Sequence, residues 1–213
     1  MMLSEGMVER LSVYRQLLVC LEHRQRTDVF SHELASLAGV TAAQVRRDLM
    51  TIGYSGNPRR GYGVAGLVAV IGGYLDSPGG QAVVLVGLGN LGRAILAYFN
   101  ERRQGLRIVA AFDRDPAKMD QIVQGCRCYP MEKLQEVVAG TGAQVGIIAV
   151  PRDGAQQVAL QLVRAGIRGL LNLSPMRLVM PDYIYVEDLN MASSLEKIAF
   201  FSRRQTGEKK VAQ

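Results

Sequence analysis

The sequence has few cysteines: Cys20, Cys126 and Cys128 are the only three among 213 residues. Three cysteines are too few for a disulfide scaffold and favour a reducing compartment. No stretch reaches the roughly 18 uninterrupted apolar residues of a transmembrane helix. The N-terminal segment also lacks the basic start and apolar run of a signal peptide. We therefore expect a cytoplasmic protein without a membrane span.

Charge of one sign is only slightly in excess. There are 25 Lys plus Arg against 19 Asp plus Glu, a net charge of +6, and hydrophobic residues make up 48% of the chain. This composition excludes a disordered chain, and the basic balance suggests a polyanionic partner, either nucleic acid or an acidic membrane surface. Residues 1–78, however, carry eight arginines against seven carboxylates, so that segment is nearly neutral. An argument for a nucleic-acid partner must therefore rest on the positions of individual arginines. The basic C-terminal tail has no assigned role.

The first part of the chain has apolar residues at helical spacing. This pattern predicts three helices, over residues 7–23, 33–38 and 64–75, with Ser31 as the cap of the second. Between the last two, Thr41 begins a further helix. Gln44 follows three residues later, which predicts a capping box in which each side chain bonds the other residue's backbone N–H.

Arginines lie outside the apolar stripe of that helix, and a turn-rich segment at 53–63 follows it and predicts a hairpin. Helix, helix, glycine turn, capped helix and basic hairpin match a winged helix-turn-helix, whose capped helix enters the major groove of DNA. Gln44 suits an adenine edge and arginine suits guanine or phosphate. The predicted DNA-binding residues are Gln44, Arg46, Arg47, Arg59, Arg60 and Tyr62. A basic helical protein–protein module remains the alternative.

After Gly80 the pattern changes to apolar strands that alternate with helices. The strands are expected at 82–86, 108–112, 145–150, 169–173 and 183–186, and the helices at 91–99, 132–139, 156–165 and 193–201. Such alternation predicts a parallel sheet covered on both faces. The expected fold is therefore α/β, a winged helix-turn-helix followed by a Rossmann doubly wound sheet. The expected domains are 1–78, 79–192 and a C-terminal helix with a basic tail at 193–213.

The first strand runs directly into Gly87-Leu88-Gly89-Asn90-Leu91-Gly92, which opens a helix. In a dinucleotide site the first glycine permits the tight turn, the second admits the pyrophosphate and the third lets the helix pack on the strand. Asp113 ends the second strand 21 residues beyond Gly92, where a carboxylate is expected on the adenosine ribose. The sequence therefore predicts a dinucleotide site that uses the helix N-terminus.

The choice of nucleotide is less sharply indicated. Asp113 favours NAD(H) over NADP(H), whereas Arg114 beside it could hold a 2′-phosphate, and coenzyme A is a related possibility. A nicotinamide would lie at the carboxyl ends of the later strands. There Val150 and Pro151 offer an apolar wall, and Asn172 and Ser174 could bond the carboxamide.

Catalytic groups are scarce near this predicted site. The two histidines, His23 and His32, both lie in the N-terminal segment, and no Ser…Tyr-x-x-x-Lys array follows the glycine motif. Cys126 and Cys128, one residue apart and without a Cys or His partner, make a poor metal site and are expected in a loop or edge strand. We therefore predict a site that binds a cofactor without turning it over and that holds no metal, and we do not expect an enzyme. An NAD-dependent oxidoreductase or a coenzyme A-binding regulator, each with an N-terminal interaction module, remains the alternative.

These motifs together resemble the Rex family of redox-sensing transcriptional repressors. The resemblance runs through Val45–Leu49, Arg59–Val64, the glycine motif, Phe112–Asp113, Val150–Pro151 and Leu171–Pro175 to the last helix. It implies a homodimer with N-terminal winged helices, C-terminal NAD(H)-binding domains and an exchanged C-terminal helix. It further implies that NADH releases the protein from palindromic operators and that NAD⁺ favours binding.

Two residues depart from the family pattern. Gln16 stands where an Arg is usual in the first helix, and Asn190 stands where an Asp is usual before the last helix. In the family this Arg and Asp, with a Tyr matching Tyr98, link nicotinamide binding to domain rotation. Either a neutral set of Gln16, Asn190 and Tyr98 replaces the ion pair, or the neighbouring Arg15 and Asp188 take over.

Overall fold

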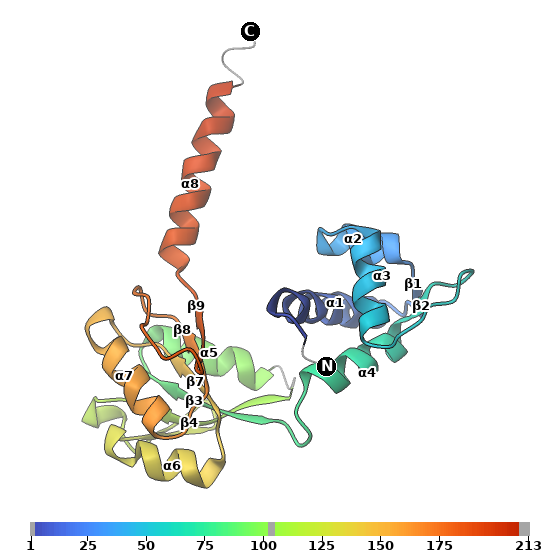
Figure 1. Cartoon of the computed structure of the whole chain (residues 1–213). Helices are drawn as coiled ribbons and strands as arrows, with labels where there is room; N and C mark the ends of the chain where they lie inside the picture. Colours follow the sequence, from blue (N-terminus) through green and yellow to red (C-terminus); the bar gives the residue numbers. More distant parts are fainter. Residues whose placement is uncertain (1–2, 102–104, 209–213) are drawn as a thin grey trace. The chain divides into compact units, whose positions relative to one another are not determined.

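The computed structural model describes residues 3–101 and 105–208, and the chain divides into two compact units, Met1–Ser77 and Pro78–Gln213 (Figure 1). The division lies one residue before the boundary expected from the sequence. Gly79 and Gly80 just after it both have positive φ, which marks the segment as a turn. Each unit has apolar core residues of its own.

The first unit buries one leucine or more from each of its helices. The fully buried leucines include Leu11, Leu34, Leu49 and Leu67, which belong to four different helices. Those helices are α1 (Glu5–His23), α2 (Ser31–Ala38), α3 (Ala42–Thr51) and α4 (Val64–Leu75). Each such side chain stabilises the folded unit by about 1.5–3 kcal/mol relative to exposure. Their common core fixes which side of α3 faces outward.

The cap of α3 is partly as expected. Thr41 Oγ1 accepts the backbone N–H of Gln44 at 3.1 Å, which confirms the N-cap. The reciprocal half of the capping box is wrong, because the Gln44 side chain instead donates to Asp48 Oδ1 at 2.8 Å. The Gln44 amide prefers Asp48 because a hydrogen bond to a buried carboxylate is stronger than one between the amide oxygen and the backbone N–H of Thr41.

The expected cap of α2 is also wrong. Ser31 is the first residue of that helix and does not precede it, and Phe30 occupies the N-cap position. Glu33 supplies the capping contact, since its Oε2 accepts the Phe30 N–H at 2.8 Å. Ser31 Oγ is used elsewhere and accepts a hydrogen bond from Arg46 Nη1 at 3.2 Å.

The wing differs from a simple hairpin. Within 53–63 an isolated bridge between Asn57 and Gly61 closes the tip. The arm that returns forms β2 (Tyr62–Gly63), which pairs antiparallel with β1 (Asp28–Val29), the segment before α2. The expected second arm therefore pairs with a distant strand, a long-range pairing that local turn signals cannot reveal.

The second unit is a seven-stranded sheet with the order β5-β6-β4-β3-β7-β8-β9. In this order, neighbours from β6 to β9 pair in parallel, and only β5 is antiparallel among the described strands of this sheet. Strand bounds are β3 (Gln81–Val86), β4 (Leu106–Phe112), β5 (Ile122–Val123), β6 (Cys126–Tyr129), β7 (Val145–Ile148), β8 (Gly169–Asn172) and β9 (Tyr185–Asp188). The chain progresses outward from β3 in both directions, so a topological switch point lies between β3 and β7. This confirms the doubly wound sheet.

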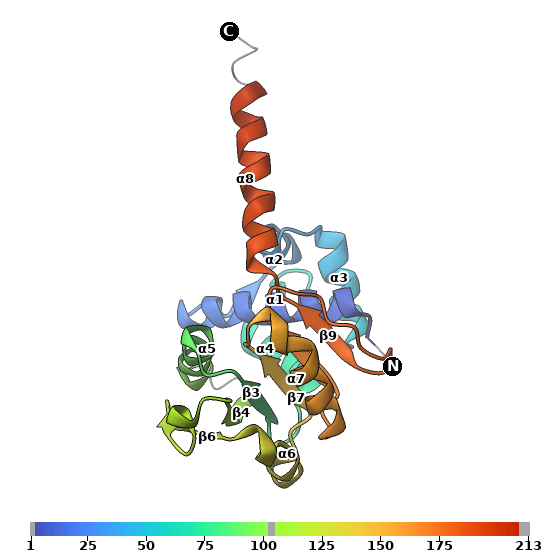
Figure 2. The same ribbon diagram turned by 90° about the vertical axis from the view of Figure 1, so that its left-hand side faces the viewer.

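Helices pack on both faces of this sheet, as expected. Val84 and Val86 of β3 share one core cluster with residues of α6 (Leu134–Thr141) and α7 (Arg152–Arg164). Val83 and Leu85 point to the other face and pack with Leu96 of α5 (Asn90–Glu101). Figure 2 shows α5 and α7 on opposite sides of the strands. Alternation along β3 thus explains its continuous apolar sequence.

Cys126 and Cys128 lie in β6, which has β5 outside it and is therefore not the edge of the sheet. Both thiols are free and buried. Burial raises the pKa of Cys126 to about 11, so the thiol is protonated and unreactive at neutral pH. These cysteines are core residues of the sheet, neither loop nor edge.

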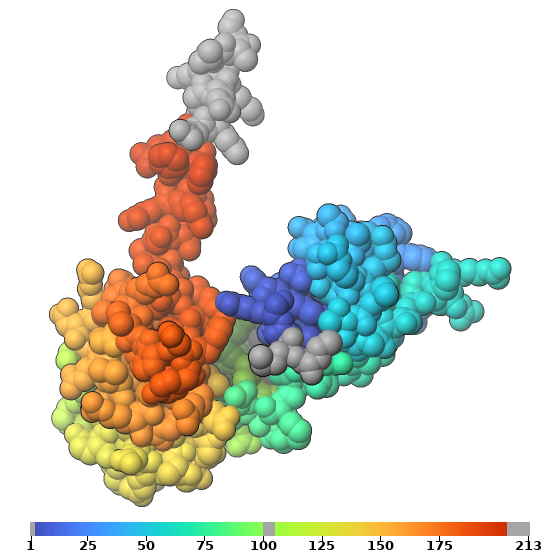
Figure 3. Space-filling view, viewed as in Figure 1, coloured from blue at the N-terminus to red at the C-terminus, as the bar shows by residue number. Residues whose placement is uncertain are grey.

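The last helix, α8 (Met191–Glu208), extends beyond the body of the second unit (Figure 3). Its apolar side chains include Leu195, Ile198 and Phe201, and each is more than half exposed to solvent. The helix is longer than the 193–201 expected from the sequence, and the rest of the tail lies outside the described residues. A helix with an apolar side and no core to cover it calls for a partner surface.

Candidate nucleotide and DNA sites

The glycine motif forms a tight turn at the switch point. Gly87 has φ of 102°, and a Cβ there would collide with the carbonyl oxygen of Ala149 at the end of β7. Its N–H donates to the Phe112 carbonyl at 2.8 Å, so the turn is bonded to β4 as well. Only glycine can occupy this position, because both the dihedral angle and the space exclude a side chain.

The other two glycines of the motif have different roles. A Cβ on Gly92 would overlap the Gly87 carbonyl oxygen, so Gly92 lets α5 pack directly on the turn. A Cβ on Gly89 would meet nothing within 4 Å, and Gly89 and Asn90 are exposed at the start of α5. The open side of the turn is therefore next to the helix N-terminus, where unpaired N–H groups favour an anion.

Leu88 and Leu91 contribute mainly backbone to this turn. The Leu88 side chain is fully buried under α5, and its N–H donates to Asp113 Oδ2 at 2.7 Å. Leu91 is half-buried. The motif and the carboxylate at the end of β4 are thus joined by a direct hydrogen bond.

Asp113 is 8% exposed and holds several donors at once. Besides Leu88, its carboxylate accepts the Asp115 N–H at 3.0 Å and Lys118 Nζ at 3.0 Å. Burial alone would raise the pKa of Asp113, but these hydrogen bonds and the lysine charge outweigh it and hold the pKa below its usual value. Arg114 is exposed. No sequence pattern indicated Lys118, because its contact with Asp113 depends on the loop after β4.

Val150 and Pro151 follow the end of β7 as expected. Val150 is half-buried, and its Cγ1 lies 3.0 Å from the position that a Gly87 Cβ would take. Pro151 is exposed and caps the N-terminus of α7. Both residues therefore lie across the switch point from the glycine turn, on the side that a nicotinamide would reach.

Asn172 and Ser174 are less accessible to a ligand than the sequence predicts, because both side chains are buried. Asn172 is 0% exposed, and its amide donates to the Met176 carbonyl and to Asp188 Oδ1. Its oxygen accepts from both the N–H and the Oγ of Ser174. Every donor and acceptor of Asn172 is thereby used inside the protein, so in this structure its side chain holds the loop after β8.

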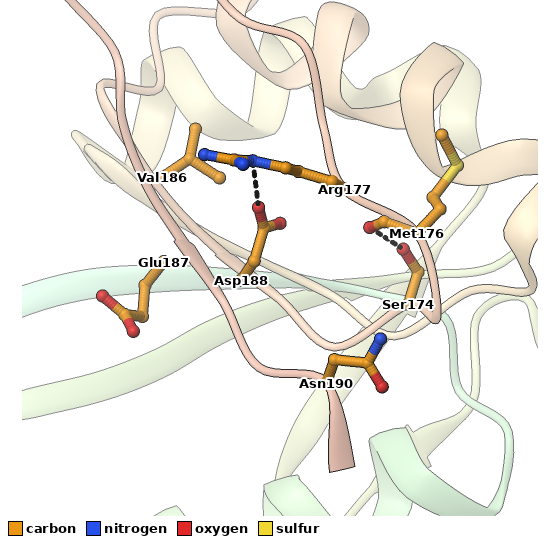
Figure 4. Close-up of a pocket in the computed structure, with 7 residues that line it drawn as sticks. All are labelled: Ser174, Met176, Arg177, Val186, Glu187, Asp188 and Asn190. Atoms are coloured by element: carbon orange, nitrogen blue, oxygen red, sulfur yellow. Dashed lines mark hydrogen bonds and ion pairs between the residues drawn. The ribbon is translucent and has the colours of Figure 1, made fainter. Parts of the chain in front are cut away.

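A pocket of about 400 Å³ lies beside this loop at the carboxyl ends of β8 and β9 (Figure 4). Its charged residues are Arg177, Glu187 and Asp188, and Arg177 Nε lies 3.8 Å from Asp188 Oδ2. The remaining lining residues are Ser174, Met176, Val186 and Asn190. Asp188 therefore faces both the pocket and the buried Asn172.

The other residues expected in the switch lie in both units. Gln16 is exposed on α1, and its neighbour Arg15 pairs with Asp76 at 2.6 Å. Tyr98 on α5 is 48% exposed. Asn190 caps α8, since its Oδ1 accepts the Ser193 N–H at 3.0 Å. In this structure Asn190 therefore has a local role that the family's Asp could equally fill, because both residues are good N-caps.

The surface that we expect to read DNA consists of α3 and the wing tip. Arg46 and Arg47 are exposed on α3, and Arg59 and Arg60 are exposed at the tip. Asn57 Oδ1 accepts the backbone N–H groups of both wing arginines, which gives the tip a defined turn. Four guanidinium groups are thus presented on two elements of one unit.

Tyr62 and Gln44 are less free than expected. The Tyr62 ring is half-buried, its centroid lies 6.2 Å from that of Tyr54, and it covers Gly56. Tyr62 therefore supports the wing from within. Gln44 is half-buried and hydrogen-bonded to Asp48, a residue that is not among the site residues predicted from the sequence. An acidic residue three positions after the inward-facing Val45 was the available signal.

Neither a membrane span nor a metal centre is found in residues 3–101 and 105–208. No helix there is long and apolar enough to cross a bilayer. No group of three or more His, Cys, Asp or Glu side chains in the same residues could hold a metal ion.

Two family models match parts of the chain. The model described as a CoA binding domain matches residues 80–176, and the model described as a putative DNA-binding protein N-terminus matches residues 2–49. The two matches fall in the two structural units.

Curated relatives match nearly the whole chain. A protein of Streptomyces avermitilis named redox-sensing transcriptional repressor Rex is 36% identical over 99% of this chain and 84% of its own length. The protein of the same name from Carboxydothermus hydrogenoformans is 39% identical over 95% of this chain and 97% of its own.

Solved structures agree with these relatives. The crystal structure of RSP, a Rex-family repressor, matches with a TM-score of 0.87 and 29% identity over 99% of both chains. The structure of RSP with β-NAD⁺ and operator DNA also has a TM-score of 0.87, at 29% identity over 99% of this chain and 97% of that one. RSP with β-NADH matches at 0.84 and 28% identity over 99% of both chains.

Proposed function

The chain belongs to the Rex family of redox-sensing transcriptional repressors, and we propose that it represses transcription in response to the NADH/NAD⁺ ratio. In this proposal it binds palindromic operator DNA and leaves it when NADH binds. The observation that carries the proposal is the pairing, in one chain, of exposed arginines on α3 and the wing with an open glycine turn at a sheet switch point. A repressor must reach the chromosome, so the proposal includes a cytoplasmic location.

The nucleotide is NAD(H) in this proposal. The pyrophosphate would lie against Gly89 and the first turn of α5, where no side chain intervenes. Asp113 would accept a ribose hydroxyl through Oδ1, which receives one hydrogen bond from the part of the chain that the structure describes, donated by the Asp115 N–H. A buried carboxylate with a lowered pKa repels the 2′-phosphate of NADP(H), so the unphosphorylated dinucleotide is favoured.

A coenzyme A-binding regulator is the second candidate, because the CoA binding domain model matches residues 80–176. Coenzyme A carries a phosphate on its adenosine ribose, close to where Asp113 would lie. Asp113 therefore disfavours it for the same electrostatic reason. Two of the RSP structures contain β-NAD⁺ or β-NADH, which also supports the dinucleotide. An oxidoreductase activity forms no part of the proposal, since the relatives are named repressors.

A homodimer with an exchanged α8 completes the proposal. The solvent-exposed apolar residues of α8, such as Leu195 and Ile198, require cover, and a second copy of the chain could supply it. A twofold dimer matches a palindromic operator, because each winged helix would read one half-site. NADH would act by binding the DNA-incompetent arrangement more tightly, with a coupling of about 1–3 kcal/mol, typical of allosteric proteins.

The experiment measures ligand affinities by calorimetry with and without a palindromic operator, using NADH, NAD⁺, NADPH and coenzyme A. We expect operator DNA to weaken NADH binding roughly 5- to 150-fold, the range that such coupling energies give. NAD⁺ binding should instead be strengthened by operator DNA, because NAD⁺ favours the DNA-bound form and the coupling is reciprocal. Tight coenzyme A binding that opposes DNA would support the second candidate. Steady turnover of NADH with a carbonyl substrate would support an enzyme.

A further inference from the structure

A single buried carboxylate joins α3 to α1 in the first unit. Asp48 lies on the core side of α3 and is 3% exposed. Arg10 of α1 donates two hydrogen bonds to it, from Nε to Oδ2 at 2.7 Å and from Nη2 to Oδ1 at 2.8 Å. Tyr14 Oη, also on α1, donates to Oδ2 at 3.0 Å, and Gln44 Nε2 donates to Oδ1 at 2.8 Å. Each carboxylate oxygen therefore accepts two hydrogen bonds, which fills its usual capacity.

The charge state of this cluster is well defined. Burial alone would raise the pKa of Asp48, but the hydrogen bonds from Arg10, Gln44 and Tyr14 outweigh it and hold the pKa below its ordinary value. Asp48 is therefore ionised at neutral pH. An ionised carboxylate accepts hydrogen bonds only, so every side chain that meets it must present a donor.

Gln44 is the member of the cluster that also faces outward. It lies in the first turn of α3 and is only half-buried. Turning its amide over would place Oε1 against the carboxylate, an acceptor against an acceptor, so Asp48 fixes which way the amide points. One N–H of Nε2 is used by Asp48. Within residues 3–101 and 105–208 the second N–H and Oε1 have no partner, and this donor and acceptor are the pair that adenine N7 and N6–H₂ require.

We propose that Asp48 is a positioning residue that fixes the Gln44 amide and thereby sets a preference for adenine at one base pair of each half-site. The inference rests on the proposed function, because it assumes that the N-terminal part of α3 enters the major groove. Asp48 itself touches no base. It acts through Gln44, while Arg10 holds the carboxylate in place through both of its oxygens. Tyr14 binds only Oδ2, the oxygen that Gln44 does not contact.

A purely structural role for the cluster makes a different prediction. If Asp48 only held α3 against α1, its loss would weaken binding to every operator by the same factor. If it also orients Gln44, its loss removes discrimination at one base pair and leaves the preferences at other positions unchanged. The pattern of base preference, not the affinity for one operator, therefore separates the two roles.

The test uses the full-length protein in its DNA-binding form and operators that carry each of the four bases at each half-site position. Affinities are measured for the wild type, Asp48→Asn, Gln44→Ala and the double variant. In Asp48→Asn one carboxylate oxygen becomes an NH₂ group, so the Gln44 amide loses its fixed orientation. The matched control is Tyr14→Phe, which removes one hydrogen bond to the same carboxylate without touching Gln44.

We expect the wild type to prefer adenine at one position by about tenfold, a typical discrimination for a bidentate contact. Asp48→Asn and Gln44→Ala should each abolish that preference, and the double variant should lose no more than either. Tyr14→Phe should keep it. A preference that survives in Asp48→Asn, or a uniform loss at all positions, overturns the positioning role. A wild type without any base preference overturns the proposed function itself.

If Asp48→Asn does not fold, NMR of the wild-type protein can still show whether Asp48 fixes the orientation of the Gln44 amide. Gln44→Glu, which lacks the amide, identifies the Gln44 side-chain resonances in a nitrogen–proton NMR spectrum. We expect one of the two wild-type amide protons to be shifted downfield by its bond to the Asp48 carboxylate. Two amide protons at the positions of exposed glutamines would overturn the proposal.

Discussion

Asn172 donates to Asp188 Oδ1 across 2.6 Å and so connects the end of β8 to the end of β9, two residues before the cap of α8. The same amide holds Ser174 and the Met176 carbonyl. One buried side chain thus holds three residues of the pocket wall in Figure 4, and one of them, Asp188, lies just before α8.

The first prediction concerns this buried amide. Asn172→Ala removes the partner of several buried polar groups, and each unsatisfied group costs about 1–3 kcal/mol. We expect the free energy of unfolding, measured with urea, to fall by at least about 2 kcal/mol. Ser174→Ala is the matched variant, because it removes the one Oγ hydrogen bond to Asn172 and should cost about 1 kcal/mol.

Ser174→Ala also tests the nicotinamide expectation directly. Because Ser174 is 3% exposed and bonded to Asn172, we expect its loss to change NADH affinity less than twofold, about 0.4 kcal/mol on the scale in which tenfold is about 1.4 kcal/mol. A tenfold loss of NADH affinity in a folded Ser174→Ala protein would restore the carboxamide contact.

The second prediction concerns the open side of the glycine turn. In Gly89→Val the new side chain occupies free space, so the fold should survive while the pyrophosphate is displaced. We expect NADH affinity to fall at least about tenfold, because this is the point of closest backbone approach to the ligand. Operator binding should remain but should no longer respond to NADH in a gel shift.

The control for this variant is Gly140→Val on α6, another glycine whose Cβ would meet nothing within 4 Å. It should bind NADH like the wild type. Gly92→Val, by contrast, should fail to fold normally, because its Cβ overlaps the Gly87 carbonyl. NADH sensitivity retained in Gly89→Val would remove the turn from the site.

The third prediction concerns the exposed arginines. Arg46→Ala or Arg47→Ala should weaken operator binding, by about 1–3 kcal/mol where the lost contact is to guanine. A lost phosphate contact should instead weaken binding to all sequences equally. It should also reduce the slope of log affinity against log salt concentration by about 1. Arg24→Ala, an exposed arginine after α1, serves as the control. Unchanged operator affinity across a salt series in both α3 variants would exclude these arginines from the DNA surface.

The fourth prediction concerns acid stability. The folded-state pKa of Asp113 is lowered, so its contribution to stability is complete above its unfolded value of about 3.9 and is lost as the pH falls through the folded value. Urea unfolding from pH 7 to pH 3 should show this loss. Asp113→Asn should be less stable than the wild type at pH 7 and should approach it at pH 3. A constant difference between the two proteins over this range would contradict the ionised, hydrogen-bonded Asp113.

The sequence by itself determined the order of the helices and of strands β3, β4, β7, β8 and β9, together with the glycine turn, whereas it predicted neither β1 nor β5. Helical spacing placed α1 and α4, and alternating apolar strands predicted the doubly wound sheet, because both patterns depend on neighbours a few residues apart. Gly87 and Gly92 also have the steric roles expected of them, and the space beside Gly89 is open. Local signals suffice wherever the backbone itself is constrained.

Only the tertiary structure decided which polar side chains are free. Asn172 and Gln44 have partners at Asp188 and Asp48, while Lys118 reaches Asp113 from a loop. The return arm of the wing likewise pairs with a strand more than thirty positions earlier in the chain. A hydrogen bond satisfies a buried polar group wherever its partner lies along the chain, and residue type alone cannot indicate that partner.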